Sequence, residues 1–395
     1  MTMSTEAPAG ATGDELVASA RELFEPLRAL AAEADEQRHL PQGAVDLFSR
    51  GGFVRTHVPK RFGGYELDLT TSFDIGIEFG RAFGSAGWVF SYWMDHAHLV
   101  ALFPDGAQQE VWRDGPDARV ATSFAPTGTA TVVDGGYVIN GEYAWGSGVG
   151  HSQWTILGGL IFPEGADHPD FKLFLVPVAE LEVVDTWHSA GLRGTGSDTV
   201  VLDDIFVPEH RSVLMEAMRE GHSPGAEVNP AWMYRIPLIA HASRALLGPA
   251  TGVVRGLSEA WQDQARTRAY TYTREEVAAS LPAQILVAES SAQIDAAELL
   301  CRRALAAVEQ EPVSLEQRVI NRRDWTYAMR QLVAAADKLM QAAGAHGILD
   351  ASPIQRAWRD VHAISSHVTM NFEAAAENYG RIALGHPINP RDPLF

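Results

Sequence analysis

The sequence is poor in cysteine and has no long apolar or basic run, and each absence excludes a class of protein. Cys301 is the single cysteine among 395 residues, so neither an intramolecular disulfide nor a cysteine-cluster metal site is available. No stretch reaches about 18 apolar residues without a charge, so we expect no membrane-spanning helix. The formal net charge is −19 at pH 7, which argues against nucleic-acid or anionic-membrane binding.

Three further signatures are missing. The N-terminus has neither the basic nor the apolar region of a signal peptide, so we expect a cytoplasmic protein. No Gly-x-Gly-x-x-Gly fingerprint is present, so the chain is not expected to bind a nicotinamide cofactor itself. The histidines include no His-Glu-x-x-His pair, and His362 and His367 are five residues apart rather than four. We therefore expect no functional metal ion.

The patterns that are present change twice along the chain. Apolar residues recur at helical spacing in both terminal regions, whereas the middle alternates as strands do. Asp-Gly and Asn-Gly pairs in the middle region are strong hairpin signals. We therefore expect an α+β fold, with a loop at 214–230 and bundle helices that include 285–308 and 325–343. Its segments are a disordered leader (1–13), an N-terminal helical domain (14–118), a central β-barrel or sandwich domain (119–213) and a C-terminal helical bundle domain (214–395).

The stretch from Tyr143 to Trp154 interrupts the strand pattern. Its three glycines permit a sharp turn or the close approach of a flat ligand, and Ser147 stands between two tryptophans. One interpretation is a wall against which a planar cofactor lies. The other is a bulged strand whose tryptophans only fill the core.

A set of short motifs occurs in a characteristic order between about Leu40 and Gly385. With the helical, β, helical layout, it resembles the acyl-CoA dehydrogenase fold and, within it, the oxygenase components of two-component flavin-dependent monooxygenases. The chain is similar to p-hydroxyphenylacetate hydroxylase and to the phenol hydroxylase of bacterial steroid degradation. The motifs are Pro-Lys-Arg-Phe-Gly-Gly (59–64), Gly-Ser-Ala-Gly-Trp (84–88), His96, Ser-Phe-Ala-Pro (123–126), Trp-Gly-Ser-Gly (145–148) with His151 and Trp154, Gly-Leu-Arg-Gly-Thr-Gly-Ser (191–197), Val-Pro (207–208) and Ser-Pro-Ile-Gln-Arg-Ala-Trp-Arg-Asp-Val-His (352–362) continuing to His367.

The resemblance also separates two chemistries. Many acyl-CoA dehydrogenases carry a glutamate base shortly after an Arg-Asp pair in the C-terminal bundle. Here Arg359-Asp360 is followed by no glutamate before Glu373, and His367 stands near the place of the base. This favours the monooxygenase branch over desaturation of a thioester.

The resemblance implies a reaction and its partners. Reduced FMN or FAD, bound non-covalently and supplied by a separate NAD(P)H:flavin reductase, would react with O₂ to a C4a-hydroperoxyflavin that hydroxylates an aromatic, phenolic or polyketide-like substrate. A homotetramer is implied by analogy. Alternatives on the same fold are N-oxygenation of a nucleotide-linked amino sugar, S-oxygenation or, less favoured, acyl-CoA dehydrogenation. A non-catalytic flavin-binding or scaffold protein is the alternative from another class.

The resemblance assigns cofactor residues to the β domain. Ser147 matches the residue that contacts flavin N5, and Trp145 would form one wall of the flavin site. Ser123 matches a residue near flavin and substrate. The 191–197 segment, with Arg193, Thr195 and Ser197, would face the ribityl chain or phosphate, although a plain turn remains an alternative for some of its glycines.

The resemblance assigns His367 as the acid or base that activates a phenol, because an imidazole titrates near neutrality. Asp360 lies seven residues earlier on an expected helix, so it either orients His367 or has a structural role. His96 and His98 lie about 200° apart on a helix, so one is expected to face inward and the other outward. The resemblance selects His96, and His151 is a weaker candidate.

Other residues are assigned to the substrate cavity or to cofactor contacts between subunits. Arg235 could hold an anionic group or be a surface charge. The candidates for the cavity are Phe124, Trp232, Met233, Tyr234 and Arg235. Arg266 and Arg268 lie where the fold places contacts to a neighbouring subunit's cofactor, but their spacing to Gln284 departs from the usual pattern, which leaves FAD and FMN open.

Overall fold

Amphipathic helices form the N-terminal region of the computed structural model, which describes residues 10–162, 165, 168–309 and 312–392. Residues 1–9 of the expected leader lie outside this range. Thr12 begins the first helix in a capping box with Glu15. The helices are α1 (Gly13–Glu22), α2 (Phe24–Gln37), α3 (Gln42–Arg50), α4 (Leu69–Ala82), α5 (Gly84–Val100) and α6 (Asp105–Val111).

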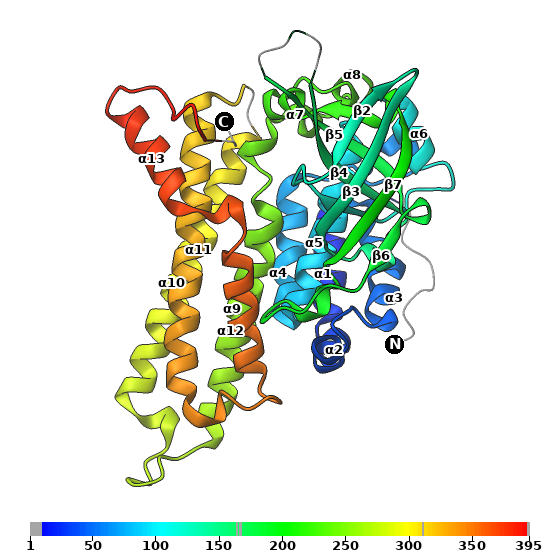
Figure 1. Cartoon of the computed structure of the whole chain (residues 1–395). Helices are drawn as coiled ribbons and strands as arrows, with labels where there is room; N and C mark the ends of the chain where they lie inside the picture. The colour runs from blue at the N-terminus through cyan, green and yellow to red at the C-terminus, as the bar shows by residue number, and fades with distance from the viewer. Residues whose placement is uncertain (1–9, 163–164, 166–167, 310–311, 393–395) are drawn as a thin grey trace.

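Helix α5 lies at the centre of the molecule (Figure 1). Sixteen of its 17 residues are buried, and Tyr92 is the exception. A helix that is apolar on nearly every face must be covered on every face. Contacts to α4, to α9 (Arg244–Thr267) of the bundle and to β1 (Val120–Ser123) of the β domain provide that cover.

The β domain consists of two four-stranded sheets, with the orders β1-β4-β5-β8 and β2-β3-β7-β6. Strands β1 and β4 pair in parallel, and all other neighbours are antiparallel. A barrel or a sandwich was predicted, and the two separate sheets are those of a sandwich. The strands are β1 (Val120–Ser123), β2 (Thr129–Val133), β3 (Gly136–Gly146), β4 (Trp154–Ile161), β5 (Asp170–Pro177), β6 (Glu182–Val184), β7 (Asp198–Pro208) and β8 (Ser212–Leu214).

The two hairpin signals have different outcomes. Asp134 and Gly135 form the two-residue turn between β2 and β3, where Val133 pairs with Gly136. The Asn-Gly pair instead lies inside β3 at a shift in register, so it is not a turn. A Cβ on Gly141 would lie 2.6 Å from the Cα of Gly128, so this glycine permits two backbones to approach closely.

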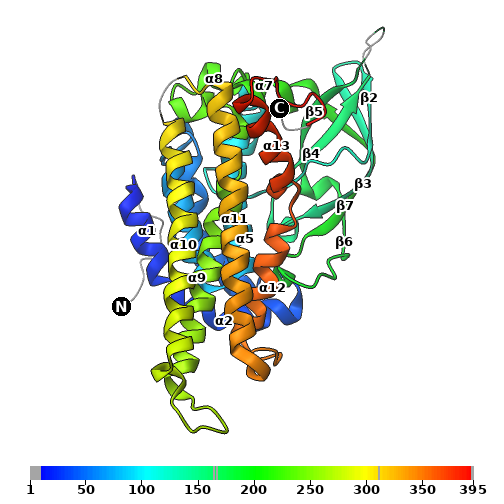
Figure 2. The same cartoon turned by 90° about the vertical axis from the view of Figure 1, so that its left-hand side faces the viewer.

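The C-terminal bundle stands beside the β domain, and its long helices α10 and α11 lie side by side and run in opposite directions (Figure 2). The predicted helices 285–308 and 325–343 are confirmed but begin earlier in the chain. The bundle helices are α9 (Arg244–Thr267), α10 (Leu281–Val308), α11 (Leu315–Ala343), α12 (Pro353–Ser365) and α13 (Phe372–Ala383).

The segment before the bundle was expected to be a loop, and this expectation is wrong. It contains α7 (Met215–Glu220) and α8 (Gly225–Val228). Met215 and Met218 of α7 are buried, so tertiary packing stabilises a helix too short to be predicted from periodicity.

Close backbone contact fixes α4 against α9. A Cβ on Gly80 would lie 2.3 Å from the carbonyl oxygen of Pro249, and one on Gly252 would lie 2.0 Å from that of Ile77. Larger residues at these positions would separate the two helices, which enclose α5. Among the described residues, no helix has both the length and the low charge that crossing a bilayer requires.

Candidate active site

One face of α5 carries a row of aromatic rings, which we call the site face: Trp88, Tyr92 and His96. Their spacing of four residues places them along one side of the helix. Ring centroids are 4.8 Å apart between Trp88 and Tyr92 and 5.0 Å apart between Tyr92 and His96. The row continues to His367, whose ring lies 6.0 Å from that of Trp88. The N-terminal helices and the C-terminal bundle therefore meet at these rings.

Three hydroxyl groups form a hydrogen-bonded series that begins at the Trp88 indole and that we call the hydroxyl chain: Ser147, Ser197 and Thr195. The Nε1–H of Trp88 donates to Ser147 Oγ at 3.0 Å. Ser197 Oγ lies 2.7 Å from both Ser147 Oγ and Thr195 Oγ1. At the far end, Thr195 Oγ1 donates to the carbonyl oxygen of Leu192 at 2.9 Å. The resemblance assigned each of these residues to the cofactor site on its own. The structure shows that hydrogen bonds join their hydroxyl groups.

The end of β3 explains how Ser147 is presented. Trp145 has a φ of 68°, unusual for a residue with a bulky side chain, and it lies at a shift in the register of β3. The N–H of Gly148 donates to the carbonyl oxygen of Thr195 at 2.9 Å, which ties the turn to the 191–197 segment. The Trp145 side chain is 64% exposed. The indole is therefore not part of the core, and its contact with a flavin stays a prediction.

Ser123 at the end of β1 is buried and donates to the carbonyl oxygen of Ala144 at 2.7 Å. This bond holds β1 beside the last residues of β3. Phe124 follows in a partly buried position against the main core. Both residues therefore lie next to the turn that carries Ser147, and their contact with a ligand stays a prediction.

His96 is neutral, and its tautomer follows from its partners. Nδ1 lies 2.6 Å from the carbonyl oxygen of Val120, which can only accept, so Nδ1 carries the proton. Nε2 accepts from the hydroxyl of Thr122 at 3.1 Å. Burial lowers the pKa of His96 to about 4, although the bond to Val120 opposes this shift. His96 therefore presents an acceptor that Thr122 already uses.

His367 is not on a helix. Helix α12 ends at Ser365, and His367 caps the short 3₁₀ turn η11 (Val368–Met370) with an extended backbone. The backbone N–H of Thr369 donates to Nδ1 at 3.3 Å, and the Thr369 hydroxyl lies 2.8 Å from the same atom. Nδ1 is thus an acceptor and Nε2 carries the proton. Burial lowers the pKa of His367 to about 4, so a neutral Nε2–H donor is presented.

Asp360 does not contact His367. Its carboxylate accepts from the backbone N–H of Leu192 at 2.7 Å, and it occupies the space where a Cβ on Gly84 would lie. The seven-residue argument fails because the helix ends before His367. Burial raises the pKa of Asp360 to about 7, against the lowering effect of the Leu192 N–H. Asp360 fixes the 191–197 segment against α5.

A neighbouring side of α5, which we call the bundle face, carries Asp95 and His98. We expected one of the two histidines to face outward, and this is wrong: His98 is fully buried and Nε2 lies 3.0 Å from the carbonyl oxygen of Met233. Asp95 pairs with Arg244 of α9 at 2.5 Å, and His241 Nδ1 lies 2.5 Å from the same guanidinium. Bundle helices cover the face that a lone surface helix would show to water.

Tyr234 packs against the bundle face of α5. It lies on η7 (Trp232–Arg235), stacks 5.7 Å from the ring of His98 and donates to the carbonyl oxygen of His57 at 3.0 Å. Arg235 is exposed and donates to the carbonyl oxygens of Pro230 and Ala226. The structure does not bring these residues to the hydroxyl chain. Nor does it bring Trp232, which donates to Val308, or buried Met233.

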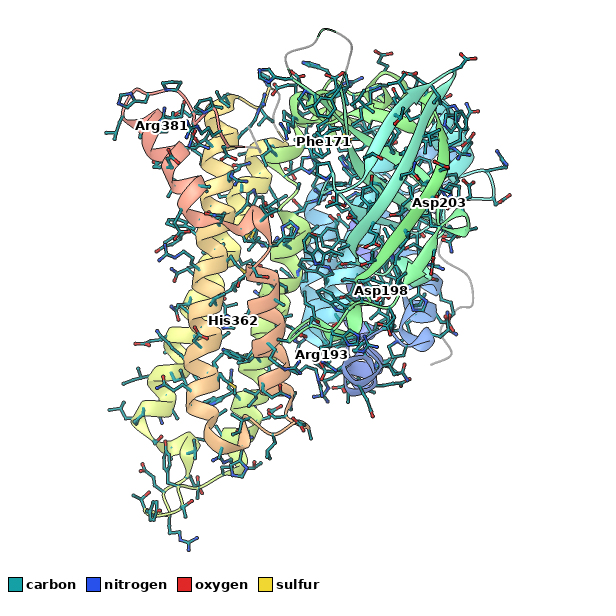
Figure 3. All side chains as sticks on the ribbon, in the orientation of Figure 1. Phe171, Arg193, Asp198, Asp203, His362 and Arg381 are labelled. Carbon is teal, nitrogen blue, oxygen red and sulfur yellow. The ribbon has the colours of Figure 1, made fainter. Side chains whose placement is uncertain are left out.

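Two further candidates bind neighbouring protein groups. Arg193 donates to the carbonyl oxygens of Asp35 and Ser189, beside α2 (Figure 3). His151 Nε2 lies 3.1 Å from the carbonyl oxygen of Leu40. The guanidinium and the imidazole thus clamp the β domain to the N-terminal helices, and a phosphate contact from Arg193 stays a prediction.

Arg266 pairs with Asp263 at 2.5 Å, and Arg268 donates to Gln264. Gln284 donates to backbone carbonyls near the start of α10. All three lie around the connection from α9 to α10. Within the described part of the chain, no group of three or more His, Cys, Asp or Glu side chains is arranged to hold a metal ion.

The residues present fit a flavin. The exposed Trp145 indole offers an apolar wall. Ser147 beside it has one hydrogen-bonding position, a lone pair or its proton, that neither Trp88 nor Ser197 uses. Sequence reasoning missed Tyr92 and the role of Trp88. The regular spacing from Trp88 to His96 was the signal that could have found both.

Comparison with known proteins agrees with this geometry. The N-terminal domain of acyl-CoA dehydrogenases matches residues 11–113, and their C-terminal domain matches residues 245–372. The oxygenase subunit HsaA of a flavin-dependent monooxygenase from Rhodococcus jostii is 36% identical over 93% of this chain and 97% of its own length. The oxygenase component of an FADH₂-dependent resorcinol hydroxylase from Rhizobium sp. is 33% identical over 93% of each chain.

Solved structures show the same relationship. The crystal structure of 3-HSA hydroxylase from Rhodococcus sp. has a TM-score of 0.90 and 34% identity, and covers 97% of this chain and 100% of its own. XiaF from Streptomyces sp., in complex with FADH₂ and glycerol, has a TM-score of 0.88 and 29% identity, and covers 96% of this chain and 97% of its own. The chain therefore belongs to the flavin-dependent monooxygenases built on the acyl-CoA dehydrogenase fold.

Proposed function

We propose that this oxygenase component hydroxylates a phenolic ring, with reduced FMN or FAD and O₂ as co-substrates. One observation carries the proposal: the Trp88 indole bonds to Ser147 on one side and meets the ring of His367 on the other. A group that contacts a flavin and a group that contacts a substrate are thus held by one rigid ring. The relatives named for resorcinol and p-hydroxyphenylacetate hydroxylation support a phenolic substrate.

Ser147 is proposed to contact flavin N5, with Trp145 as the apolar wall and Ser123 beside them. When bound, reduced flavin supplies the activation of O₂. The task of the chain is then to hold the flavin edge and to exclude water. Trp88 and Ser197 hold Ser147 from two sides, so its oxygen has little freedom to move away.

His367 is proposed to bind the oxygen of the phenol. Its Nε2–H can donate to that oxygen, and such a bond is stronger to a phenolate than to a neutral phenol. A phenolate is the more reactive form toward an electrophilic oxygen at the ring carbon beside it. His367 therefore acts first as a donor that favours ionisation, and a base role would require the other tautomer.

The same geometry argues against the alternatives. An acyl-CoA dehydrogenase needs a free carboxylate base, and the nearby carboxylate of Asp360 is bound to Leu192. An amino-sugar substrate has no phenolic oxygen for His367 to bind.

We also propose a cytoplasmic homotetramer that receives its flavin from a separate reductase. The relatives are named as oxygenase subunits or components, which supports a reductase on a separate chain. Exposed apolar side chains on α10, among them Leu281, Ile285 and Leu299, support burial of this helix between subunits. Light scattering of the purified protein measures the assembly directly.

The proposed reaction is tested with chemically reduced flavin and isotopically labelled O₂, offered with a panel of phenols. We expect one labelled oxygen atom in a catechol or quinol product. His367→Ala should lower product formation about 10- to 100-fold at unchanged flavin affinity, since a hydrogen bond to a charged oxygen contributes about 1.5–3 kcal/mol.

His362→Ala is the matched control. His362 lies five residues earlier, points toward α11 and pairs with exposed Asp337 (Figure 3). This variant should keep its product yield. Turnover of an acyl-CoA with an artificial electron acceptor, with no labelled phenol product, would contradict the proposal.

A further inference from the structure

The hydroxyl chain of Ser147, Ser197 and Thr195 can direct its protons in two ways. Each hydroxyl has one proton to donate and two lone pairs that accept. Trp88 Nε1–H can only donate, so it takes one lone pair of Ser147 in either direction. The direction of the remaining bonds decides whether Ser147 offers a ligand its other lone pair or its proton.

In the first direction, protons run away from the ligand. Thr195 donates to the carbonyl oxygen of Leu192, Ser197 donates to Thr195, and Ser147 donates to Ser197. All three protons are then used inside the protein. Ser147 is left with one open lone pair toward the ligand.

In the second direction, every hydroxyl turns round. Thr195 donates to Ser197, Ser197 donates to Ser147, and the proton of Ser147 points out of the chain. The carbonyl oxygen of Leu192 keeps the N–H of Thr195 at 3.1 Å and Nε1–H of Trp187 at 2.9 Å, but loses the hydroxyl. The first direction therefore keeps one more hydrogen bond within the protein.

The two directions suit different redox states of a flavin. N5 of an oxidised flavin has a lone pair and no proton, whereas N5 of a reduced flavin carries an N–H. We propose that Ser197 and Thr195 are positioning residues that fix Ser147 as an acceptor and so make the site selective for reduced flavin. This inference rests on the proposed contact between Ser147 and flavin N5.

The selection has a use in a two-component enzyme. Reduced flavin arrives by diffusion and competes with oxidised flavin for one site. An open lone pair on Ser147 favours the N–H form, and no covalent bond or proton transfer is involved, because the hydroxyl groups only rotate. The ligand that is selected is the one that can react with O₂.

Thr195→Val is the sharpest test. Valine keeps the shape of threonine but removes both the donor and the acceptor, so the proton of Ser197 can turn only to Ser147. Ser147 then presents its own proton. We expect the ratio of the dissociation constants of oxidised and reduced FMN, measured anaerobically, to fall at least about fivefold, which corresponds to one net hydrogen bond.

Two further variants keep the test decisive if Thr195→Val is poorly folded. Ser197→Ala removes the acceptor of the Ser147 proton, and the ratio should fall in the same direction. Thr195→Ser keeps the hydroxyl and should restore the ratio of the parent protein. A structural effect of a smaller side chain would instead weaken both redox forms together.

Ser152→Ala is the matched control. Ser152 accepts from Nε1–H of Trp93 at 3.1 Å and donates to the carbonyl oxygen of Gly148 at 2.9 Å. This is the same kind of indole and hydroxyl pairing, five residues along α5, but the hydroxyl bonds to no member of the hydroxyl chain. The ratio of the dissociation constants of oxidised and reduced FMN should stay within about twofold of the parent value. A change of that size is smaller than the effect of one net hydrogen bond.

The outcomes separate this inference from the proposed function. Binding of neither redox form by the parent protein overturns both. Reduced-flavin binding and labelled-oxygen transfer by the parent, with unchanged ratios in Thr195→Val and Ser197→Ala, overturns this inference alone. It is also overturned if Thr195→Ser behaves as Thr195→Val does.

Discussion

The two faces of α5 are alike in one group, a buried histidine, and differ in what they contact. Both carry a buried histidine whose pKa is lowered by burial, to about 4 for His96 and about 3 for His98. On the bundle face, Asp95 is paired with Arg244 and covered by helices. On the site face, the rings of Trp88 and Tyr92 lead to His367 of another domain.

The difference shows that burial and a shifted pKa do not by themselves mark a site. Among the residues of α5, only Tyr92 is not buried, and it lies on the site face. The adjoining Ser147 and His367 are also partly exposed. A functional face is recognised here by polar atoms that are fixed by the protein and still open on one side.

The largest effect is expected from breaking the bundle face. Arg244→Met should destabilise the fold by about 3–5 kcal/mol, because Asp95 would remain as a buried carboxylate without a partner. Urea unfolding measures the change. Adding Asp95→Asn should recover most of it, and Arg266→Ala, which breaks an exposed pair, should cost no more than about 1 kcal/mol.

A folded Arg244→Met variant should still bind flavin, because the guanidinium binds Asp95, His241 and Ser72 and has no bond to the hydroxyl chain or to His367. If its stability is unchanged while flavin binding is lost, the two faces are not separate and the comparison fails.

The pH dependence of the free energy of unfolding should show a smaller difference between the two faces. Burial lowers the pKa of His367 from 6.5 to about 4, so between these values the unfolded chain binds more protons than the folded one. The free energy of unfolding therefore falls as pH falls from 6.5 to 4, and below that His367 has no further effect. The loss from His367 is about 3 kcal/mol at most.

His367→Gln should flatten the stability profile between pH 6.5 and 4. For His98→Gln the flattened window should extend to about pH 3, because burial lowers the pKa of His98 to about 3. Unfolding curves at several pH values measure both slopes. Profiles parallel to that of the parent protein would show that neither imidazole is neutral in the fold.

The sequence predicts well what depends on local chemistry. The order of helical and β regions follows from periodicity, and the Asp134-Gly135 turn follows from the need for positive φ at a short hairpin. Ser147 and Thr195 were assigned through the resemblance of the short glycine-rich motifs that contain them, and their contact with a flavin stays a prediction. Each of these features is decided within about ten residues of chain.

What the sequence could not predict depends on packing between distant segments. The helical spacing of Asp360 and His367 was a sound argument, but α12 ends at Ser365. His98 was expected to face outward because no local signal shows that α9 covers it. The hydroxyl of Tyr234 is bound to His57, 177 residues away in the sequence, which no local pattern shows, and its contact with a substrate stays a prediction.

The smallest effect is expected at Trp145, whose side chain is exposed to solvent beside Ser147. Its indole is 64% exposed, so removing it costs little packing, and its φ of 68° suits glycine. Trp145→Gly should therefore leave stability unchanged or raise it by about 1 kcal/mol. Flavin affinity should fall about 2- to 12-fold, as expected for one lost ring contact of about 0.5–1.5 kcal/mol.

Trp145→Ala separates the two effects, because alanine loses the indole but keeps a Cβ at a positive φ. It should show the weaker flavin binding without the gain in stability, and Trp145→Phe should keep most of the affinity. Thermal unfolding and anaerobic flavin titration measure the two quantities independently. The proposal for Trp145 is contradicted if Trp145→Gly unfolds more easily than the parent protein and binds flavin with the affinity of the parent. The indole would then be a packing residue, and the open side of the site face would lie elsewhere.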